Sequence, residues 1–251
     1  MVSRSAALAG RATKMVVGAN HYVLKNQMEG PYPAQYKKMV FANGCFWGSE
    51  KGAWRLPGVF TSACGYCAGF TPNPTYEEAC SGKSGHTEAV QVVFDPEKIA
   101  YTDILRWFWE SHDPSQGMGQ GNDRGTQYRS GLYWFDDEQK ALVLSSKDAY
   151  EKALGRKITT ECAPAADYEK DGSELFYFAE DYHQQYLAKP GARPYCSAQP
   201  QCVSLPPFSE WTPAGLENHA PKLPEAFWTK HAPKPHCVIR APNPQIKDGE
   251  W

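Results

Sequence analysis

The chain has no apolar run long enough to cross a bilayer, which takes about 20 consecutive residues in a helix. It also lacks an apolar N-terminal core of the secretory kind, so we do not expect export. The formal net charge is only -2 and no basic cluster stands out, so we expect neither a nucleic acid nor a membrane as a partner. With 41% hydrophobic residues among 251, the composition fits a soluble protein with a real core.

The first 28 residues contain neither aspartate nor glutamate, and they carry Arg4, Arg11, Lys14 and Lys25. Basic, serine-containing segments without acids are typical of organelle transit peptides. A plain flexible terminus has the same composition, and we favour that interpretation for an N-terminal extension at residues 1–38. We therefore expect a cytoplasmic protein, with a mitochondrial or plastid location as the alternative if the segment is a transit peptide.

The eight cysteines would suggest a disulfide framework in a short secreted chain, but no secretory signal accompanies them here. We therefore expect reduced thiols, some of them redox-active. Cys64 and Cys67 have the spacing of a redox pair or of half a zinc site. The only further zinc ligands to be imagined lie far along the chain: His231, His236 and Cys237. We interpret Cys64 and Cys67, like Cys80 and Cys162, as small structural residues, and we expect no metal.

The hydrophobic pattern predicts strands and helices in the order β-α-β-β-α-β, followed by another helix and strand. The predicted strands cover residues 39–43, 59–65, 88–94, 132–135 and 158–162. The predicted helices cover residues 45–55, a segment capped by Thr102 and running to Trp109, and residues 137–154 between Asp136 and Gly155, with a further short helix within 176–187. Loops rich in glycine and polar residues separate them at 68–86 and 112–129. This order is the split βαβ pattern, so we expect an α+β two-layer sandwich with a ferredoxin-like core and its helices on one face of the sheet.

The composition changes at Pro206, and nine prolines fall between that residue and Trp251. The same segment contains large aromatics, which disordered tails usually lack: Phe208, Trp211, Phe227, Trp228 and Trp251. We therefore expect residues 206–251 to be an irregular, proline-rich C-terminal extension that wraps over a central domain at 39–205, with one helical turn near 225–230. An interaction segment for an unidentified partner is the alternative.

Cys45 follows a predicted strand and Gly44, and it opens a predicted helix. Unpaired backbone N–H groups and the helix dipole favour a thiolate at such a position, and the thiolate is the nucleophilic form. Phe46 and Trp47 beside it could form an apolar wall for a small group such as a thioether methyl. From spacing alone, a buried structural cysteine between two core aromatics stays an open alternative.

Residues 44–48, Gly-Cys-Phe-Trp-Gly, resemble the signature of peptide methionine sulfoxide reductase type A. Further segments match the family in its order: 65–66, 71–76, 85–90, 112–114, 121–129 and 179–186. The resemblance implies that Cys45 attacks the sulfur of methionine sulfoxide and that Phe46 and Trp47 hold the substrate methyl. It also implies that only the S epimer is reduced, free or in proteins, as repair of damage under oxidative stress.

The resemblance assigns the sulfoxide oxygen to four further residues. Glu88 would protonate it, Tyr76 and Tyr128 would hydrogen-bond it, and Asp123 would complete the polar network. The assignment is physically sound, because a sulfoxide oxygen is a poor leaving group until protonated, and a buried carboxylic acid can supply a proton at neutral pH. Phenol hydroxyls can stabilise charge developing on the oxygen. Taken singly, Glu88 could be a solvated edge residue and either tyrosine a loop residue, so the matched order carries the assignment.

Reaction at Cys45 would leave a sulfenic acid, which a second thiol usually reduces through a disulfide. The resemblance implies a recycling cysteine shortly after 179–186, where Cys196 stands, and Cys202 is a plausible second one. Here the chain departs from many members, which have a glycine-rich stretch between the two cysteines, because residues 197–201 read Ser-Ala-Gln-Pro-Gln. Thioredoxin, or dithiothreitol in its place, is the expected reductant of a monomer with no bound cofactor. We expect His183, despite its matching segment, to pack or hydrogen-bond rather than to catalyse.

Two rival interpretations stay open at this point. A thiol peroxidase could also use Cys45, but it would not need the wall of Phe46 and Trp47 and would favour a cationic group near the sulfur. A metal-binding or redox-sensing module could instead be built on Cys64 and Cys67, and bound zinc would support it.

Overall fold

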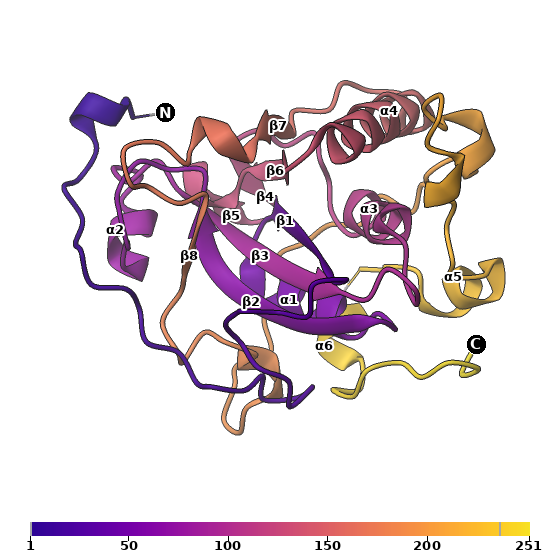
Figure 1. Cartoon of the computed structure of the whole chain (residues 1–251), viewed down its shortest axis with the longest axis horizontal. Coiled ribbons are helices and arrows are strands. Elements are labelled where there is room, and N and C mark those ends of the chain that lie inside the picture. The colour runs from indigo at the N-terminus through magenta and orange to yellow at the C-terminus, as the bar shows by residue number, and fades with distance from the viewer. Residues whose placement is uncertain (1, 236) are drawn as a thin grey trace.

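A six-stranded sheet forms the centre of the protein. The computed structural model describes residues 2–235 and 237–251. The strands lie in the order β7-β6-β1-β3-β2-β8, and neighbours are antiparallel except β6 and β7, which are parallel. Figure 1 shows the long strands curving across the middle of the molecule. The bounds are β1 (Lys37–Asn43), β2 (Val59–Cys67), β3 (Thr87–Phe94), β6 (Ser130–Trp134), β7 (Glu161–Pro164) and β8 (Phe176–Phe178), and a separate ribbon pairs β4 (Gly119–Gln120) with β5 (Asp123–Arg124).

The helices differ widely in length. The α-helices are α1 (Phe46–Trp54), α2 (Tyr76–Cys80), α3 (Tyr101–Glu110), α4 (Asp137–Leu154), α5 (Glu225–His231) and α6 (Cys237–Arg240). The 3-10 turns are η1 (Arg4–Ala6), η2 (Thr126–Tyr128), η3 (Ala165–Asp167), η4 (Tyr186–Ala188), η5 (Phe208–Glu210) and η6 (Glu217–His219). Within the described ranges, none of the helices has the length and apolar character needed to pass through a membrane.

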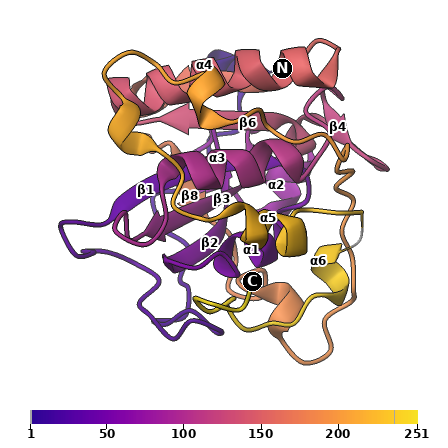
Figure 2. The same cartoon turned by 90° about the vertical axis from the view of Figure 1, so that its right-hand side faces the viewer.

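The α-helices α1, α3 and α4 share one face of the sheet, because strand side chains alternate between its faces. Met39 and Phe41 of β1 join the apolar cluster that includes residues of these three helices. Val40 and Ala42 point the other way, toward irregular segments that include Met28. Helices α3 and α4 lie side by side in both views (Figure 1, Figure 2). The helical layer therefore sits where α1, which follows Cys45, can be braced from its outer side.

Local sequence signals placed α4 well and α3 less well. The Asp136 carboxylate accepts the backbone N–H of Gln139 at 2.7 Å, and Gly155 ends α4 with φ 70°, as predicted. In α3 the predicted cap is wrong, because the helix begins at Tyr101 and its N-cap is Ala100. The Thr102 hydroxyl instead donates to the carbonyl of His219 in the C-terminal segment, 2.6 Å away. The local cap of α3 is instead the Asp103 carboxylate, which accepts the backbone N–H of Ala100 at 3.0 Å.

The short helix predicted within residues 176–187 is also wrong. Phe176–Phe178 forms the edge strand β8 along residues 65–67 of β2, and in the rest of this fully described stretch η4 is the one helical turn. Three consecutive aromatic residues fit a strand, because aromatic side chains are enriched in strands. The predicted loop at 68–86, conversely, contains α2, which begins at a capping box formed by Thr75 and Glu78.

The C-terminal segment follows an irregular path over the helical face, and α5 lies where one helical turn was predicted. Trp54 of α1 donates its indole N–H to the carbonyl of Asn243 at 2.8 Å. The Asp103 carboxylate of α3 accepts the backbone N–H of Lys222 at 2.8 Å. The segment is thereby tied to both helices that flank the Cys45 turn, while the domain boundaries drawn at residues 38 and 206 stay a prediction.

Candidate active site

Cys45 lies at the N-cap of α1, directly after β1. Gly44 before it has φ +94°, and a β-carbon there would lie 2.7 Å from the side chain of Gln120. Both the backbone angle and the close approach therefore require glycine in this turn. The turn leaves Cys45 only 7% exposed, with its thiol at the amino end of a nine-residue helix.

The pKa of the Cys45 thiol is raised well above its usual value, chiefly by burial and then by the Glu88 carboxylate. The backbone N–H of Trp47 opposes these effects by hydrogen-bonding the sulfur. The helix terminus thus favours the anion, as predicted, but desolvation outweighs it and the net shift is toward the neutral thiol.

Glu88, near the start of β3, is buried rather than solvated, with 2% of its surface exposed. Its Oε2 accepts the backbone N–H of Phe46 at 3.0 Å, so the carboxyl shares the amino end of α1 with Cys45. Burial raises the pKa of Glu88 to about 8, against the lowering effect of that N–H, and Asp123 raises it further. The carboxyl is therefore mostly protonated at neutral pH and can donate a proton.

The predicted tyrosines and aspartate gather around the same point. The Tyr128 hydroxyl hydrogen-bonds Tyr76 at the start of α2, and the Glu88 carboxyl contributes to raising the pKa of both phenols, after burial. Oδ1 of Asp123 accepts the Tyr195 hydroxyl at 2.5 Å. Its buried Oδ2 finds no hydrogen-bond partner among the residues that the structure describes. This oxygen is therefore available to accept a further hydrogen bond.

Phe46 and Trp47 play unequal parts in the apolar wall. Phe46 is fully buried, 5.0 Å from the ring of His183, and belongs to the core. Trp47 is only half-buried and stacks on Tyr186 with ring centroids 4.0 Å apart. Its indole N–H donates to Nδ1 of His183 at 3.0 Å. Burial lowers the pKa of His183 to about 4, so this neutral ring orients Trp47, in keeping with the packing role expected for it.

The two predicted recycling cysteines lie in different surroundings. Cys196 packs against the first turn of α1, since a β-carbon on Gly48 would come within 2.5 Å of its sulfur. Its thiol is also one of the groups that raise the pKa of Cys45. Cys202 is exposed, with φ 55°. The structure thus brings Cys196 to the site and leaves Cys202 at the surface, with no disulfide among the seven cysteines whose side chains it describes.

Sequence reasoning missed two residues that shape the site. The Glu180 carboxylate accepts the Tyr66 hydroxyl at 2.7 Å and the backbone N–H of Tyr76 at 2.8 Å, which fixes the start of α2. Tyr195 holds Asp123, as described above. Two features of the sequence could have pointed to them: Glu180 lies in the matched segment 179–186, and Tyr195 directly precedes Cys196.

Cys64 and Cys67 cannot act as a pair, because three residues of spacing on one strand place them on opposite faces of the sheet. The Cys64 thiol donates to the buried carboxyl of Glu50 at 3.3 Å. In the part of the chain that is described, no three potential ligands gather to hold a metal. His236, named above as an imaginable ligand, lies outside the described residues. The placing of the two thiols on opposite faces argues against a sensing module built on this pair.

A neutral thiol beside a protonated carboxyl can attack an electrophilic atom while the acid protonates the departing group. The groups that most affect the Cys45 sulfur are carboxyls, a thiol and a backbone N–H, and none of these is the cation that a thiol peroxidase would favour. Fold and site together define a thiol-dependent reductase with an aromatic wall. The family model of peptide methionine sulfoxide reductase matches residues 37–209, and the chain belongs to this family.

Curated relatives match most of the chain. Peptide methionine sulfoxide reductase MsrA 2 of Nostoc sp. is 52% identical over 204 residues, which cover 80% of this chain and 88% of the relative. MsrA 1 of Caulobacter vibrioides is 53% identical over 193 residues, covering 75% and 85%. Among solved structures, methionine sulfoxide reductase A of Corynebacterium diphtheriae has 37% identity and a TM-score of 0.68, over 78% of this chain and 92% of that one. Reduced Mxr1 from Saccharomyces cerevisiae has 30% identity and a TM-score of 0.60, over 69% and 96%.

Proposed function

We propose that this protein reduces the S epimer of methionine sulfoxide to methionine, in proteins and as the free amino acid. Family membership supports the reaction class. The observation that carries the proposal within this chain is the placing of Glu88, whose buried carboxyl has a pKa of about 8 and shares the amino end of α1 with Cys45. An acid at that place can protonate the oxygen of a sulfoxide whose sulfur the thiol attacks.

In the proposed first step, the Cys45 sulfur attacks the sulfoxide sulfur while Glu88 gives its proton to the oxygen. The thiol proton of Cys45 passes to Glu88, so the carboxyl is restored. The hydroxyl group then passes from the substrate sulfur to the Cys45 sulfur as the new bond between the two sulfurs breaks, which leaves a Cys45 sulfenic acid and methionine. The substrate sulfur is thereby reduced by two electrons and the cysteine sulfur is oxidised by two. Tyr76 and Tyr128 would donate hydrogen bonds to the sulfoxide oxygen, and the open oxygen of Asp123 would accept one from that oxygen once it carries the proton from Glu88. Trp47 would pack against the methyl group of the substrate.

In the proposed second step, the thiol of Cys196 attacks the sulfenic sulfur of Cys45, a disulfide forms and water leaves. The packing of Cys196 against the first turn of α1 supports this assignment. Two thiols of thioredoxin, or of dithiothreitol, would then reduce the disulfide. Cys202 is the candidate for relaying the exchange outward, since its exposure gives a protein reductant access.

The proposal also covers the fold class of the protein, its oligomeric state and the compartment in which it works. Strands β6-β1-β3-β2 are antiparallel in that order, with α1 between β1 and β2 and α3 between β3 and β6, which supports a ferredoxin-like, two-layer α+β core. We propose a monomer that works in the cytoplasm, repairs oxidised proteins and binds no cofactor.

A turnover assay with separated S and R epimers of a blocked methionine sulfoxide, driven by dithiothreitol, tests the function. We expect reduction of the S epimer alone and none by Cys45→Ser. Cys162→Ser is the matched control, because Cys162 is half-buried on β7, away from the site, and should leave the rate unchanged. Failure to reduce either epimer, together with rapid peroxide consumption, would replace the proposal with the peroxidase alternative.

A further inference from the structure

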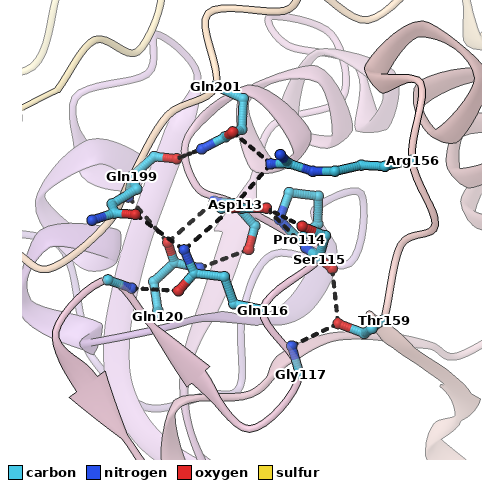
Figure 3. Close-up of polar contacts among 11 residues, drawn as sticks. Asp113, Pro114, Ser115, Gln116, Gly117, Gln120, Arg156, Thr159, Gln199 and Gln201 are labelled. Carbon is cyan, nitrogen blue, oxygen red and sulfur yellow. Dashed lines mark hydrogen bonds and ion pairs between the residues drawn. The ribbon is translucent and has the colours of Figure 1, made fainter.

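The segment that follows Cys196 has no regular secondary structure, yet side chains of a neighbouring loop hold it firmly (Figure 3). The backbone N–H of Gln199 donates to Oε1 of Gln120 at 3.0 Å. The Gln199 side-chain oxygen accepts from Nε2 of Gln116 at 3.0 Å. Residues 197–201 contain no glycine, so tertiary contacts of this kind, rather than a flexible backbone, set their path.

The Gln120 side chain is itself fixed, because it is 1% exposed and its amide is used on both sides. Nε2 donates to the Asp113 carbonyl at 2.8 Å, and Oε1 accepts the Asp113 N–H at 3.2 Å in addition to that of Gln199. The pairing with the Asp113 backbone allows one orientation of the amide, since only the oxygen can face two N–H groups. The Asp113 backbone therefore fixes the direction of the Gln120 side-chain oxygen independently of its hydrogen bond to Gln199.

Gln120 also touches the turn that carries the nucleophile. A β-carbon on Gly44 would lie 2.7 Å from Cβ and Cγ of Gln120, so these methylenes rest on the residue directly before Cys45. One side chain thus spans from the Cys45 turn to the residue three places after Cys196.

Two glycines leave the room that the segment needs to pack closely. A β-carbon on Gly121 would come within 2.2 Å of the Ser197 carbonyl oxygen, and one on Gly48 within 2.5 Å of the Cys196 sulfur. Farther along the segment, Arg156 donates to the Gln201 side-chain oxygen at 2.6 Å and pairs with Asp113 at 3.0 Å. The close approach to the two glycines lies at residues 196–197, at the thiol itself.

We propose that Gln120 is a positioning residue for the second step, which holds residues 197–199 so that the Cys196 sulfur stays within reach of the Cys45 sulfenic acid. The inference rests on the proposed function, in which Cys196 displaces water from that acid. Releasing Gln199 would widen the space that the Cys196 thiol samples and lower its effective concentration. A misplacement of about 1 Å can slow a reaction by up to about a hundredfold.

The test is a single-turnover experiment with excess S epimer and no reductant. Methionine release reports the first step, and mass spectrometry after alkylation of free thiols reports the disulfide between Cys45 and Cys196. In Gln120→Ala we expect the ratio of the second rate to the first to fall tenfold or more, with sulfenic acid accumulating. Gln199→Ala is the matched control: it keeps the backbone N–H that Gln120 holds and loses only the Gln116 contact, so its ratio should change less than threefold.

Gln120→Glu provides a second variant should the alanine protein fold poorly. It keeps an acceptor for the Gln199 N–H but loses the donor to Asp113, so we expect an intermediate ratio. Equal ratios in wild type and both Gln120 variants, or an equal slowing of both steps, would overturn the positioning role. If the wild type reduces the S epimer but forms no disulfide with Cys196, the recycling assignment and this inference fall together while the reductase proposal stands. If the wild type reduces neither epimer, the proposed function itself fails.

Discussion

At Cys45, the helix terminus and burial act on the thiol in opposite directions. The N–H of Trp47 stabilises a thiolate, whereas burial and the Glu88 carboxylate raise the pKa of the thiol, and the net shift is upward. A neutral thiol must give up its proton as it attacks. The carboxyl of Glu88, with a pKa of about 8, is the group placed to exchange protons with both the thiol and the substrate oxygen.

Glu88→Gln should slow the first step at least a hundredfold and leave the fold intact, because the amide keeps an oxygen for the Phe46 N–H but cannot donate an acidic proton. Since only the protonated acid donates, the wild-type rate should be constant below about pH 8 and fall above it. Single-turnover rates across pH measure both. A normal rate in Glu88→Gln, with wild-type circular dichroism, would sink the proton-donor role.

The family resemblance named Cys45, Glu88 and Cys196 before any geometry, and these roles stay predictions; the ionisation of Cys45 and Glu88 could not be predicted from the sequence. The pKa of Cys45 depends on how much water the tertiary structure removes, and a local helix signal carries no information about that. Gln120 escaped notice for a related reason. An uncharged amide has no chemical signature in a sequence, and its role arises only from the backbone groups around it.

At the scale of elements, Glu50 joins α1 to β2 and to the turn before η4. Its fully buried carboxyl accepts hydrogen bonds from the backbone and side-chain N–H groups of Gln185 at 2.7 and 2.6 Å, and from the Ser62 hydroxyl at 3.2 Å. Gln185 adopts φ 48° and immediately precedes Tyr186, the ring stacked on Trp47. The carboxyl thereby connects the core to the half-buried wall of the site.

Glu50 should make the protein less stable as pH rises. Burial raises its pKa from 4.5 to about 7, so the folded protein keeps a proton that the unfolded chain releases. The stabilisation is fully present below about pH 4.5 and is lost as pH rises through 7. Urea unfolding of wild type and Glu50→Gln at pH 5 and pH 8 isolates the effect. From pH 5 to pH 8, the free energy of unfolding of wild type should fall by about 2 to 3 kcal/mol relative to that of Glu50→Gln. A relative change below about 0.5 kcal/mol would contradict the raised pKa of the buried carboxyl.

Elements defined by neighbouring residues were predictable, and elements defined by distant contacts were not. Helix α4 carries its own signals in Asp136 and Gly155. Strand β8 exists because the edge of β2, far earlier in the chain, offers it a partner. The aromatic residues at 176–178 favour a strand, but nothing local to them indicates that the edge of β2 is the partner.

At the scale of the whole molecule, the C-terminal segment behaves as part of the core that supports the site. Helix α5 and the chain around it lie across α1 and α3 in Figure 2. The core cluster shared with α1 and α3 includes five side chains of this segment: Trp211, Leu223, Phe227, Trp228 and Ile246. Arg106 of α3 lies over the Trp228 ring at 4.5 Å and pairs with Glu225 at 2.5 Å. The segment could still bind a partner through its outer surface, but its inner surface is committed to the fold.

Removing residues 208–251 should therefore expose an apolar surface on α1 and α3 and leave a protein that aggregates or unfolds well below the wild-type temperature. A truncated protein that fails to express gives no free energy of unfolding, so Trp228→Ala is the variant on which the loss of stability is measured. This side chain is 2% exposed, and deleting it should cost about 3 to 5 kcal/mol in urea unfolding. Val16→Ala, at a side chain 82% exposed, should change the free energy of unfolding by less than about 0.5 kcal/mol. A truncated protein with wild-type stability and activity would mean instead that the segment is a separable interaction module, and that α1 needs no brace to hold Cys45.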